Sequence, residues 1–243
     1  DNLFVLFPFE KKYFLPHGIT TTYIGHPFLN NIKNINSTKN LLKIEKKIIS
    51  IFPGSRKSEI DKHLNKILFF LSKEDSYKNF KFLIVAVDRY RELIKKTSNL
   101  YSDLLDITVL KSSQYKNYAF KNSNYAIAVS GTIAFELALS KVPLIVVYKL
   151  NFLSYFILKN MVKVKYVSLA NIILNKKVIP ELIQYNFSYK NFHKELNNLI
   201  INPRSKNRQL EMFGKLESIL QKNINNRGKT IAMNEIIKLL KKN

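Results

Sequence analysis

The stretch Tyr125-Ala-Ile-Ala-Val-Ser-Gly-Thr-Ile-Ala-Phe-Glu-Leu-Ala-Leu-Ser-Lys-Val-Pro-Leu-Ile-Val-Val-Tyr148 decides the fold of this chain. Its apolar run at 125–129 predicts a short buried strand, and the run at 144–147 predicts a second one. Between them, a tight turn at 130–132 leads into a helix. One face of that helix is apolar, which predicts that it packs on a sheet; the face is made of Ile133, Ala134, Leu137 and Ala138.

The turn in this stretch has the chemistry of a phosphate site. A glycine turn that leads into a helix presents free backbone N–H groups and the positive end of the helix dipole. Glu136 lies one turn into the helix, where its carboxylate can accept hydrogen bonds from a sugar hydroxyl. The alternative is structural: Thr132 caps the helix and Glu136 complements its dipole. The stretch alone leaves both interpretations open.

A second glycine turn occurs earlier in the chain. Residues 47–52 predict an apolar strand, and Pro53-Gly54-Ser55-Arg56 follows it directly. The next helix has an apolar face made of Ile60, Leu64, Ile67, Leu68 and Leu71. Gly54 permits close approach of a ligand to the backbone, and Arg56 can hold a phosphate with its planar guanidinium. The order is not that of a P-loop, so the nucleotide need not be ATP. Arg56 as a solvated surface charge is the alternative.

The remaining elements continue the alternation of strands and helices. Apolar runs predict strands at 80–87 and 107–110, and helical patterns follow at 90–97 and 115–121. Two polar helices are expected within 190–221. This order predicts an α/β fold with a parallel, doubly wound, Rossmann-like sheet flanked by helices. Ligands bind such sheets at the carboxyl ends of the strands, where both glycine turns fall.

The sequence divides into four parts. Residues 47–224 are predicted to form the α/β domain, and the polar, lysine-rich residues 31–46 an interdomain linker. Residues 1–30 contain two short strands, at 3–7 and 21–24, and are expected to be a remnant of a preceding domain. Because the chain begins at Asp1 and not at Met, we expect this end to be a cut. Residues 225–243 predict a final helix.

Composition narrows the function classes. The 243 residues include no cysteine, which excludes disulfides and fits a reducing cytoplasm. Forty Lys and Arg against seventeen Asp and Glu give a formal charge of +23, which favours an anionic partner. A bias towards A/T-rich codons would produce the same excess of lysine. Residues 151–164 read either as a basic amphipathic helix at a membrane interface or as a core helix with lysines at its edge.

Six short motifs then occur in register along the chain. They are Leu6-Phe7-Pro8-Phe9-Glu10, Gly25-His26-Pro27, Phe52-Pro53-Gly54-Ser55-Arg56 with Glu59-Ile60, Ser130-Gly131-Thr132 with Glu136, Tyr166-Val167-Ser168-Leu169 with Asn171, and Pro180-Glu181-Leu182 with Gln184. Together they resemble the C-terminal part of the lipid-A-disaccharide synthases. Each motif alone is weak, whereas their common order and spacing over most of the chain are specific.

The resemblance implies a two-domain GT-B glycosyltransferase of which this chain carries the UDP-binding half. Such an enzyme transfers 2,3-diacylglucosamine from UDP to 2,3-diacylglucosamine 1-phosphate, at the cytoplasmic face of the inner membrane and as a peripheral protein. No metal or other cofactor is implied, and a homodimer is left open. In this picture Arg56 is the catalytic residue that stabilises the departing diphosphate. The substrate-binding residues are Gly54, Ser55, Ser130, Gly131, Thr132, Glu136, Asn171, Glu181 and Gln184.

The resemblance also places the general base in the half that this chain lacks. We therefore expect the chain alone to be poorly soluble and inactive; otherwise Glu10, His17 or His26 would have to be the base. His26 can equally be a polar group that holds its turn.

Two other functions remain open at this stage. One is another GT-B enzyme that uses UDP-sugars, such as a UDP-N-acetylglucosamine 2-epimerase, although the block at 180–184 favours the synthase. The other is a nucleic-acid-binding protein, which the charge favours but for which the sequence lacks interleaved aromatic and basic motifs.

Overall fold

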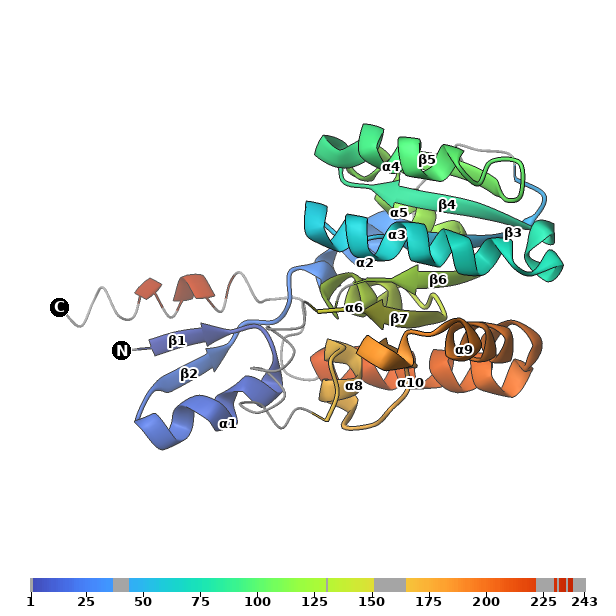
Figure 1. Ribbon diagram of the computed structural model, residues 1–243. Coiled ribbons are helices and arrows are strands. Elements are labelled where there is room, and N and C mark those ends of the chain that lie inside the picture. The colour runs from blue at the N-terminus through green and yellow to red at the C-terminus, as the bar shows by residue number, and fades with distance from the viewer. Residues whose placement is uncertain are drawn as a thin grey trace.

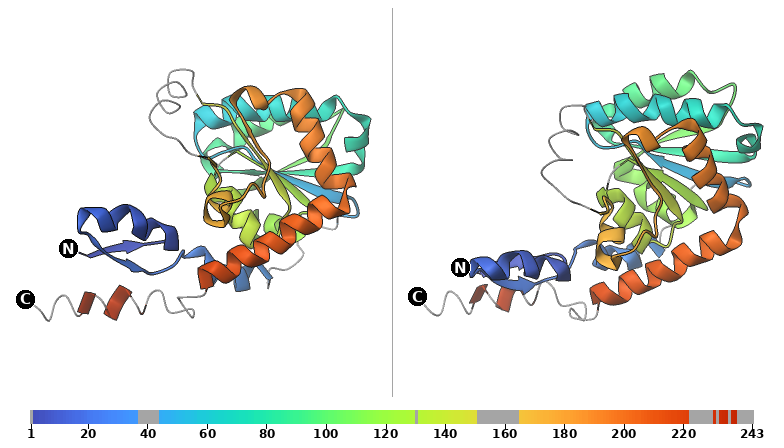
Figure 2. Two further views of the ribbon diagram at one scale, coloured as in Figure 1. Left: turned by 90° about the horizontal axis from the view of Figure 1, so that it is seen from below. Right: turned by 60° about the horizontal axis from the view of Figure 1, so that its bottom comes forward.

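The computed structural model describes residues 2–36, 44–129, 131–150, 165–221, 230, 232–234 and 236–237. A small N-terminal unit built on two strands lies beside a larger α/β domain (Figure 1). Two further views show the same arrangement, with the long helix near the C-terminus passing beneath the sheet (Figure 2).

The larger domain is built on a six-stranded parallel sheet. Its strands are β3 (Lys47–Phe52), β4 (Phe80–Ala86), β5 (Asp106–Lys111), β6 (Tyr125–Ala128), β7 (Leu144–Tyr148) and β8 (Glu181–Ile183), in the order β5-β4-β3-β6-β7-β8. Every neighbouring pair is parallel. The predicted Rossmann-like α/β class is therefore confirmed. Strand β8, which pairs with β7, was not predicted.

Helices cover both faces of this sheet. One face carries α3 (Lys57–Ser72), α4 (Arg91–Asn99) and α9 (Tyr189–Ile201); the other carries α5 (Ser112–Asn122), α6 (Gly131–Leu139), α8 (Leu169–Leu174) and α10 (Pro203–Gln221). Short 3-10 turns are η3 (Asp75–Asn79), η4 (Asp88–Tyr90) and η5 (Gln184–Asn186). Successive strand residues point to opposite faces, so Ile127 and Ile145 join one core while Ala126 and Leu144 join the other. Burial on both faces explains why the strands are continuous apolar runs.

The N-terminal unit pairs β1 (Asn2–Val5) with β2 (Thr20–Tyr23) in parallel, and η1 (Pro8–Glu10), α1 (Lys11–Phe14) and η2 (Leu15–His17) connect them. Its contacts with the α/β domain include a ring pair and a hydrogen bond. The ring of Phe7 meets the edge of Phe135 on α6, with centroids 5.3 Å apart. The hydroxyl of Tyr23 donates to the carbonyl of Leu220 at the end of α10, at 3.0 Å.

The first residues of the predicted linker at 31–46 are helical, because Phe28–Asn36 form helix α2. The helix starts directly after Pro27, and the backbone N–H of Phe28 donates to the ring of His26 at 3.2 Å. Phe28 and Ile35 are buried in the core beside α6, with Ile32 partly buried there. The apolar side chains of α2 lie on both sides of the boundary that was predicted at residue 30. Neither predicted segment therefore contained the whole helical repeat.

Two predicted segments fall largely outside the described residues. Residues 151–164, the expected amphipathic helix, lie outside them entirely. Of the expected final helix at 225–243, the described residues Thr230, Ala232–Asn234 and Ile236–Ile237 are helical, and three of their apolar side chains are exposed: Met233, Ile236 and Ile237. Within the ranges that the structure describes, no helix combines the length and the apolar character needed to cross a membrane.

Candidate functional site

The two glycine turns lie next to each other at the carboxyl edge of the sheet. β3 and β6 are neighbours in register, with Phe52 opposite Ala128, so the turn at Gly54 and the turn at Gly131 begin at the same level. In Figure 1 this edge faces the side on which β1 and β2 lie. The structure thus brings the two predicted phosphate sites together. Ser130 lies outside the described residues.

Glu59 holds the first turn in place. Its Oε2 accepts the backbone N–H groups of Ser55, at 2.9 Å, and of Arg56, at 3.3 Å. Gly54 has φ +107°, and a Cβ at this position would lie 2.6 Å from the same Oε2. Only glycine adopts this backbone without strain and leaves room for the carboxylate. Glu59 is buried. It was not among the predicted site residues, although it belongs to the motif quoted above. Its position five residues after Gly54 is the sequence signal that could have identified it.

Guanidinium groups flank the same turn. The side chain of Arg56 is 74% exposed, and its Nη1 lies 3.4 Å from Glu59 Oε1. Arg89, on η4, donates from Nη2 to the carbonyl of Ser55 at 2.8 Å. Arg89 was not predicted, since it follows the neighbouring strand β4 and not the turn itself. A ligand at this turn therefore meets two positive charges, of which that of Arg56 is largely exposed to solvent.

The glycine of the second turn has more room around it than Gly54. A Cβ on Gly131 would lie 3.3 Å from the carbonyl of Val167, and Thr132 is exposed. Glu136 has a side chain that is 14% exposed, and its Oε2 lies 2.5 Å from Nζ of Lys116 on α5. The ammonium and the carboxylate form an ion pair, but their geometry is not that of a hydrogen bond. No other described residue donates a hydrogen bond to Oε2. Lys116 was not predicted, because it lies twenty residues away on a helix that meets α6 only in three dimensions.

His26 approaches the same place from the N-terminal unit. Its ring stacks on Phe7 and meets the edge of Phe135, with centroids 5.4 and 5.0 Å apart. Burial lowers its pKa, and the charge of Glu136 opposes that shift. His26 also accepts the N–H of Phe28, so it has the role of a group that holds the turn.

Asn171 and Glu181 are engaged with the protein itself. Asn171 is fully buried; its Oδ1 accepts the backbone N–H groups of Val178 and Ile179, both at 2.9 Å. Its Nδ2 donates to the carbonyl of Ile179 and to Oε1 of Glu181, at 2.9 and 2.8 Å. Glu181 in turn accepts the N–H groups of Val167 and Ser168, at 3.0 and 2.8 Å. This network holds the segment that lies against Gly131.

Gln184, the last predicted binding residue, lies apart from the two turns. It follows β8, two strands from β6 in the sheet, and its backbone has φ +55°. That substrate contacts any of these predicted residues stays a prediction.

His63 connects α3 to the end of β7. Its Nδ1 donates to the carbonyl of Glu59 at 2.6 Å, and its Nε2 accepts the N–H of Lys149 at 2.7 Å. The ring stacks on Tyr148 and Phe187. These partners require the neutral imidazole, and burial lowers its pKa from 6.5, assisted by the charges of Lys62 and Lys66 and opposed by the contacts with Glu59.

Stability should therefore depend on pH through His63. The unfolded chain binds a proton near pH 6.5, whereas the folded protein resists it, so the free energy of unfolding falls as the pH drops below about 6.5. The loss stops below the folded pKa, and His26 contributes in the same direction. Urea titrations at pH 7.5 and 5.5 should show that the free energy of unfolding falls less between these pH values in His63→Gln than in the unchanged chain. An equal fall in both would contradict this account.

The edge as a whole is suited to an anion that also carries hydroxyl groups. It offers the positive ends of α3 and α6, the guanidinium groups of Arg56 and Arg89, and the carboxylate of Glu136. Among the residues described, no group of three or more His, Cys, Asp or Glu side chains is placed to hold a metal ion. The arrangement can bind a phosphate and a sugar hydroxyl side by side.

Comparisons with known families agree with one another. A family model described as lipid-A-disaccharide synthetase matches residues 1–235. The lipid-A-disaccharide synthase of Rickettsia felis is 36% identical over 231 residues, covering 91% of this chain and 56% of that protein. The synthase of Hydrogenovibrio crunogenus is 32% identical over 230 residues, covering 92% and 61%. The chain thus spans little more than half the length of these curated relatives.

Solved structures show the same fold in more distant proteins. The UDP-GlcNAc 2-epimerase of Neisseria meningitidis bound to UDP-GlcNAc superposes with a TM-score of 0.58 at 16% identity, covering 99% of this chain and 60% of its own. WaaG, a glycosyltransferase involved in lipopolysaccharide biosynthesis, gives 0.51 at 12% identity, covering 90% and 60%. Because epimerases and glycosyltransferases share this fold, the likeness establishes the architecture and leaves the reaction open.

Proposed function

Because the chain belongs to the lipid-A-disaccharide synthetase family, we propose that its α/β domain binds the UDP part of a UDP-2,3-diacylglucosamine donor. The complete protein then transfers the diacylglucosamine to 2,3-diacylglucosamine 1-phosphate and releases UDP. It works at the cytoplasmic face of the inner membrane as a peripheral protein. The formal charge of +23 supports this placement, since it favours contact with anionic lipid.

One observation carries the proposal: both glycine turns follow adjacent strands at one edge of the sheet. A diphosphate placed there faces the starts of α3 and α6, and Arg56 has the freedom to reach it because its side chain is 74% exposed. Glu136 lies one turn further into α6, at a depth that suits a ribose hydroxyl. Its pairing with Lys116 keeps a positive charge beside it when the nucleotide displaces water.

The chemistry at this edge concerns the leaving group. When the bond between the sugar and the diphosphate breaks, negative charge accumulates on the diphosphate oxygens. Preorganised helix dipoles and a guanidinium stabilise that charge without reorganising. Attack by the acceptor hydroxyl also needs a general base. Glu10 is poorly placed for this role, because its Oε2 already accepts the N–H groups of Leu6 and Phe7, at 2.9 and 2.8 Å.

Calorimetry with UDP and with pyrophosphate on the 243-residue chain tests the nucleotide site. We expect Arg56→Ala to weaken both ligands by about tenfold, the scale of one charge-assisted hydrogen bond. Arg56→Lys should restore little, because an ammonium cannot form a bidentate contact. Glu136→Gln should weaken UDP and leave pyrophosphate unchanged, since only the nucleoside carries a ribose.

The control for this experiment is Lys96→Ala, which removes an exposed charge from α4. If Arg56→Ala binds both ligands like the unchanged chain, the diphosphate does not lie at the Gly54 turn. If Glu136→Gln binds UDP normally, Glu136 serves only the helix dipole and its pair with Lys116.

A further inference from the structure

Lys116, on α5, is the ion-pair partner of Glu136 at the nucleotide edge. Its Nζ lies 2.5 Å from Oε2 of Glu136, and the side chains of the lysine and the glutamate are 33% and 14% exposed. The carboxylate is thus the more deeply covered member of the pair. Because the two residues come from different helices, the pair fixes a side chain of α6 from α5.

The ammonium group of Lys116 is itself held in place. Its Nζ lies 5.5 Å from the centroid of the Phe120 ring, one turn further along α5, and an ammonium is attracted to an aromatic face at this distance. Phe120 is buried and packs against Phe28 of α2 and Phe52 of β3, with ring centroids 5.8 and 5.6 Å apart. Lys116 therefore approaches Glu136 from a packed part of the domain.

The two oxygens of the Glu136 carboxylate have different surroundings. Oε2 is buried and faces Lys116. No described residue donates a hydrogen bond to Oε1. A carboxylate can accept hydrogen bonds at both oxygens, so pairing at Oε2 leaves Oε1 available to a ligand.

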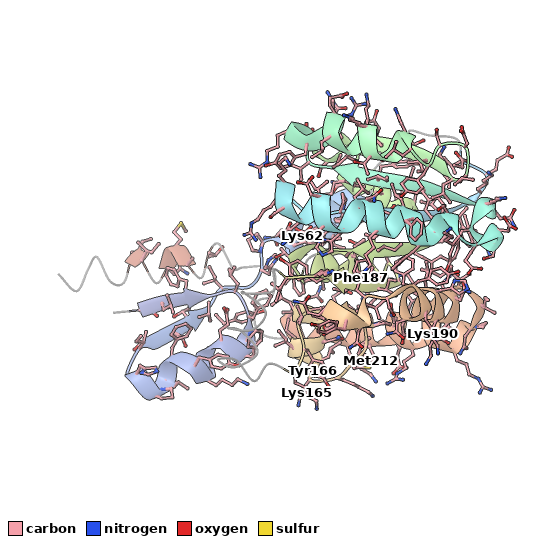
Figure 3. All side chains as sticks on the ribbon, in the orientation of Figure 1. Lys62, Lys165, Tyr166, Phe187, Lys190 and Met212 are labelled. Atoms are coloured by element: carbon pink, nitrogen blue, oxygen red, sulfur yellow. The ribbon has the colours of Figure 1, made fainter. Side chains whose placement is uncertain are left out.

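No second cation is paired with Glu136 in the part of the chain that the structure describes. His26 is close enough to interact with its charge, but burial lowers the pKa of His26, so this ring is neutral near pH 7.5. Its Nδ1 accepts the N–H of Phe28. Helix α3, on which Figure 3 labels Lys62, covers the opposite face of the sheet. Lys116 is thus the counter-charge on which the position of Glu136 depends.

An unpaired carboxylate in this position would not stay where it is. Removing one member of a buried ion pair leaves the other charge uncompensated, which is costly. The flexible side chain of Glu136 can avoid that cost by turning its carboxylate towards water. Oε1 would then no longer face a nucleotide at the edge of the sheet.

We propose that Lys116 is a positioning residue that determines how strongly the site selects a nucleotide for its ribose hydroxyl groups. It holds Oε2 of Glu136 and thereby presents Oε1 to the hydroxyls, without touching the ligand itself. The inference rests on the proposed function, in which Glu136 accepts a hydrogen bond from the ribose. The diphosphate is bound separately, because Glu136 lies five residues beyond Gly131, roughly 7–8 Å along the helix axis.

The test compares UDP with 2′,3′-dideoxy-UDP, which lacks both ribose hydroxyls, by calorimetry on the 243-residue chain. We expect the unchanged chain to bind UDP about tenfold more tightly, the scale of one charge-assisted hydrogen bond. Lys116→Met should reduce this preference to nearly none. Lys116→Arg should retain most of it, since a guanidinium also pairs with a carboxylate. A preference that survives unchanged in Lys116→Met would overturn the proposal.

A double-mutant cycle shows whether Lys116 acts through Glu136. Glu136→Gln should lose the preference, and adding Lys116→Met to it should change nothing further, because the lysine has no other route to the ribose. If Lys116→Met lowers the preference again in the Glu136→Gln background, the lysine contacts the ligand directly and the positioning role is wrong. The matched control is Lys121→Met, which removes an exposed charge at the other end of α5 and should retain the full preference.

Pyrophosphate separates this inference from misfolding and from the proposed function. It carries no ribose, so Lys116→Met should bind it like the unchanged chain at 0.15 M salt, where the screening length is about 8 Å. A loss of pyrophosphate affinity in this variant would mean that the pair supports the phosphate turn, and would overturn the assignment to the ribose. If the unchanged chain does not bind UDP, the proposed function fails and this inference with it. If it binds UDP and the preference survives Lys116→Met, this inference alone fails.

Discussion

We expect Asn171→Ala to lower the free energy of unfolding by about 3–5 kcal/mol, one of the largest losses available from a single side chain here. Asn171 is fully buried, and its amide serves the N–H groups of Val178 and Ile179 and the carbonyl of Ile179. Without it, two buried backbone donors lose their acceptor, and each costs about 1–3 kcal/mol. Since whole domains are stable by only about 5–15 kcal/mol, much of the chain's stability depends on this residue.

Asn171→Asp sharpens the test. The substitution keeps the shape but places a second carboxylate where Nδ2 now donates to Glu181 Oε1 at 2.8 Å. It should destabilise the chain at pH 7, and part of the loss should be recovered as the pH falls and one of the two carboxylates is protonated. Urea unfolding followed by circular dichroism measures both effects. The control is Asn65→Ala, because Asn65 is exposed and its side chain accepts from the hydroxyl of Tyr101. Equal losses in Asn171→Ala and Asn65→Ala would contradict the network.

Gly54→Ala should be the second large effect, with a loss of about 2–4 kcal/mol and of the phosphate-binding turn together. Two costs add at this position. The backbone has φ +107°, and the new Cβ would lie 2.6 Å from Oε2 and 2.7 Å from Cβ of Glu59. Glu59 is the acceptor for Ser55 and Arg56, so any shift that relieves the contact also releases those two N–H groups.

Gly18→Ala measures the cost of backbone strain in the absence of a steric clash. Gly18 also has positive φ, +68°, but a Cβ there would have no neighbour within 4 Å. Its cost should be about 1 kcal/mol, the backbone term alone. Thermal unfolding of both variants, combined with UDP calorimetry, gives the comparison. Equal losses in the two variants would show that the fit between Gly54 and Glu59 has no energetic weight.

The sequence predicted those parts of the fold that depend on local pattern. The apolar run 47–52 and the glycine turn after it stand where predicted, because burial on both faces makes each strand a continuous apolar segment. Strand β8 was missed, since its three residues are too few to show a period. Helix α2 was missed because its apolar stripe crossed the assumed boundary.

The candidate site also has one part that local sequence predicts and another part that it does not. Both turns could be predicted, since glycine at a strand end is a local signal. The pairing of Lys116 with Glu136 and the approach of Lys66 to Phe187 could not, because each joins helices or loops that are distant in sequence. Asn171 and Glu181 were predicted to bind substrate, and the structure shows that they form hydrogen bonds with each other and with the backbone. Burial alone did not reveal whether the partner was protein or substrate.

The hydrogen bond from Tyr23 to the carbonyl of Leu220 joins residues 197 positions apart, which sets an order of events during synthesis. A ribosome adds about 5–20 residues per second, so roughly 10–40 s pass between the appearance of Tyr23 and that of its partner. Tyr23 has no α10 to pack against until the end of that interval, whereas α6, which contacts Phe7, is synthesised within it. Tyr23 on β2 therefore gains this partner only after every strand of the α/β domain has been made, and a nascent chain stalled before α10 leaves its ring without that cover.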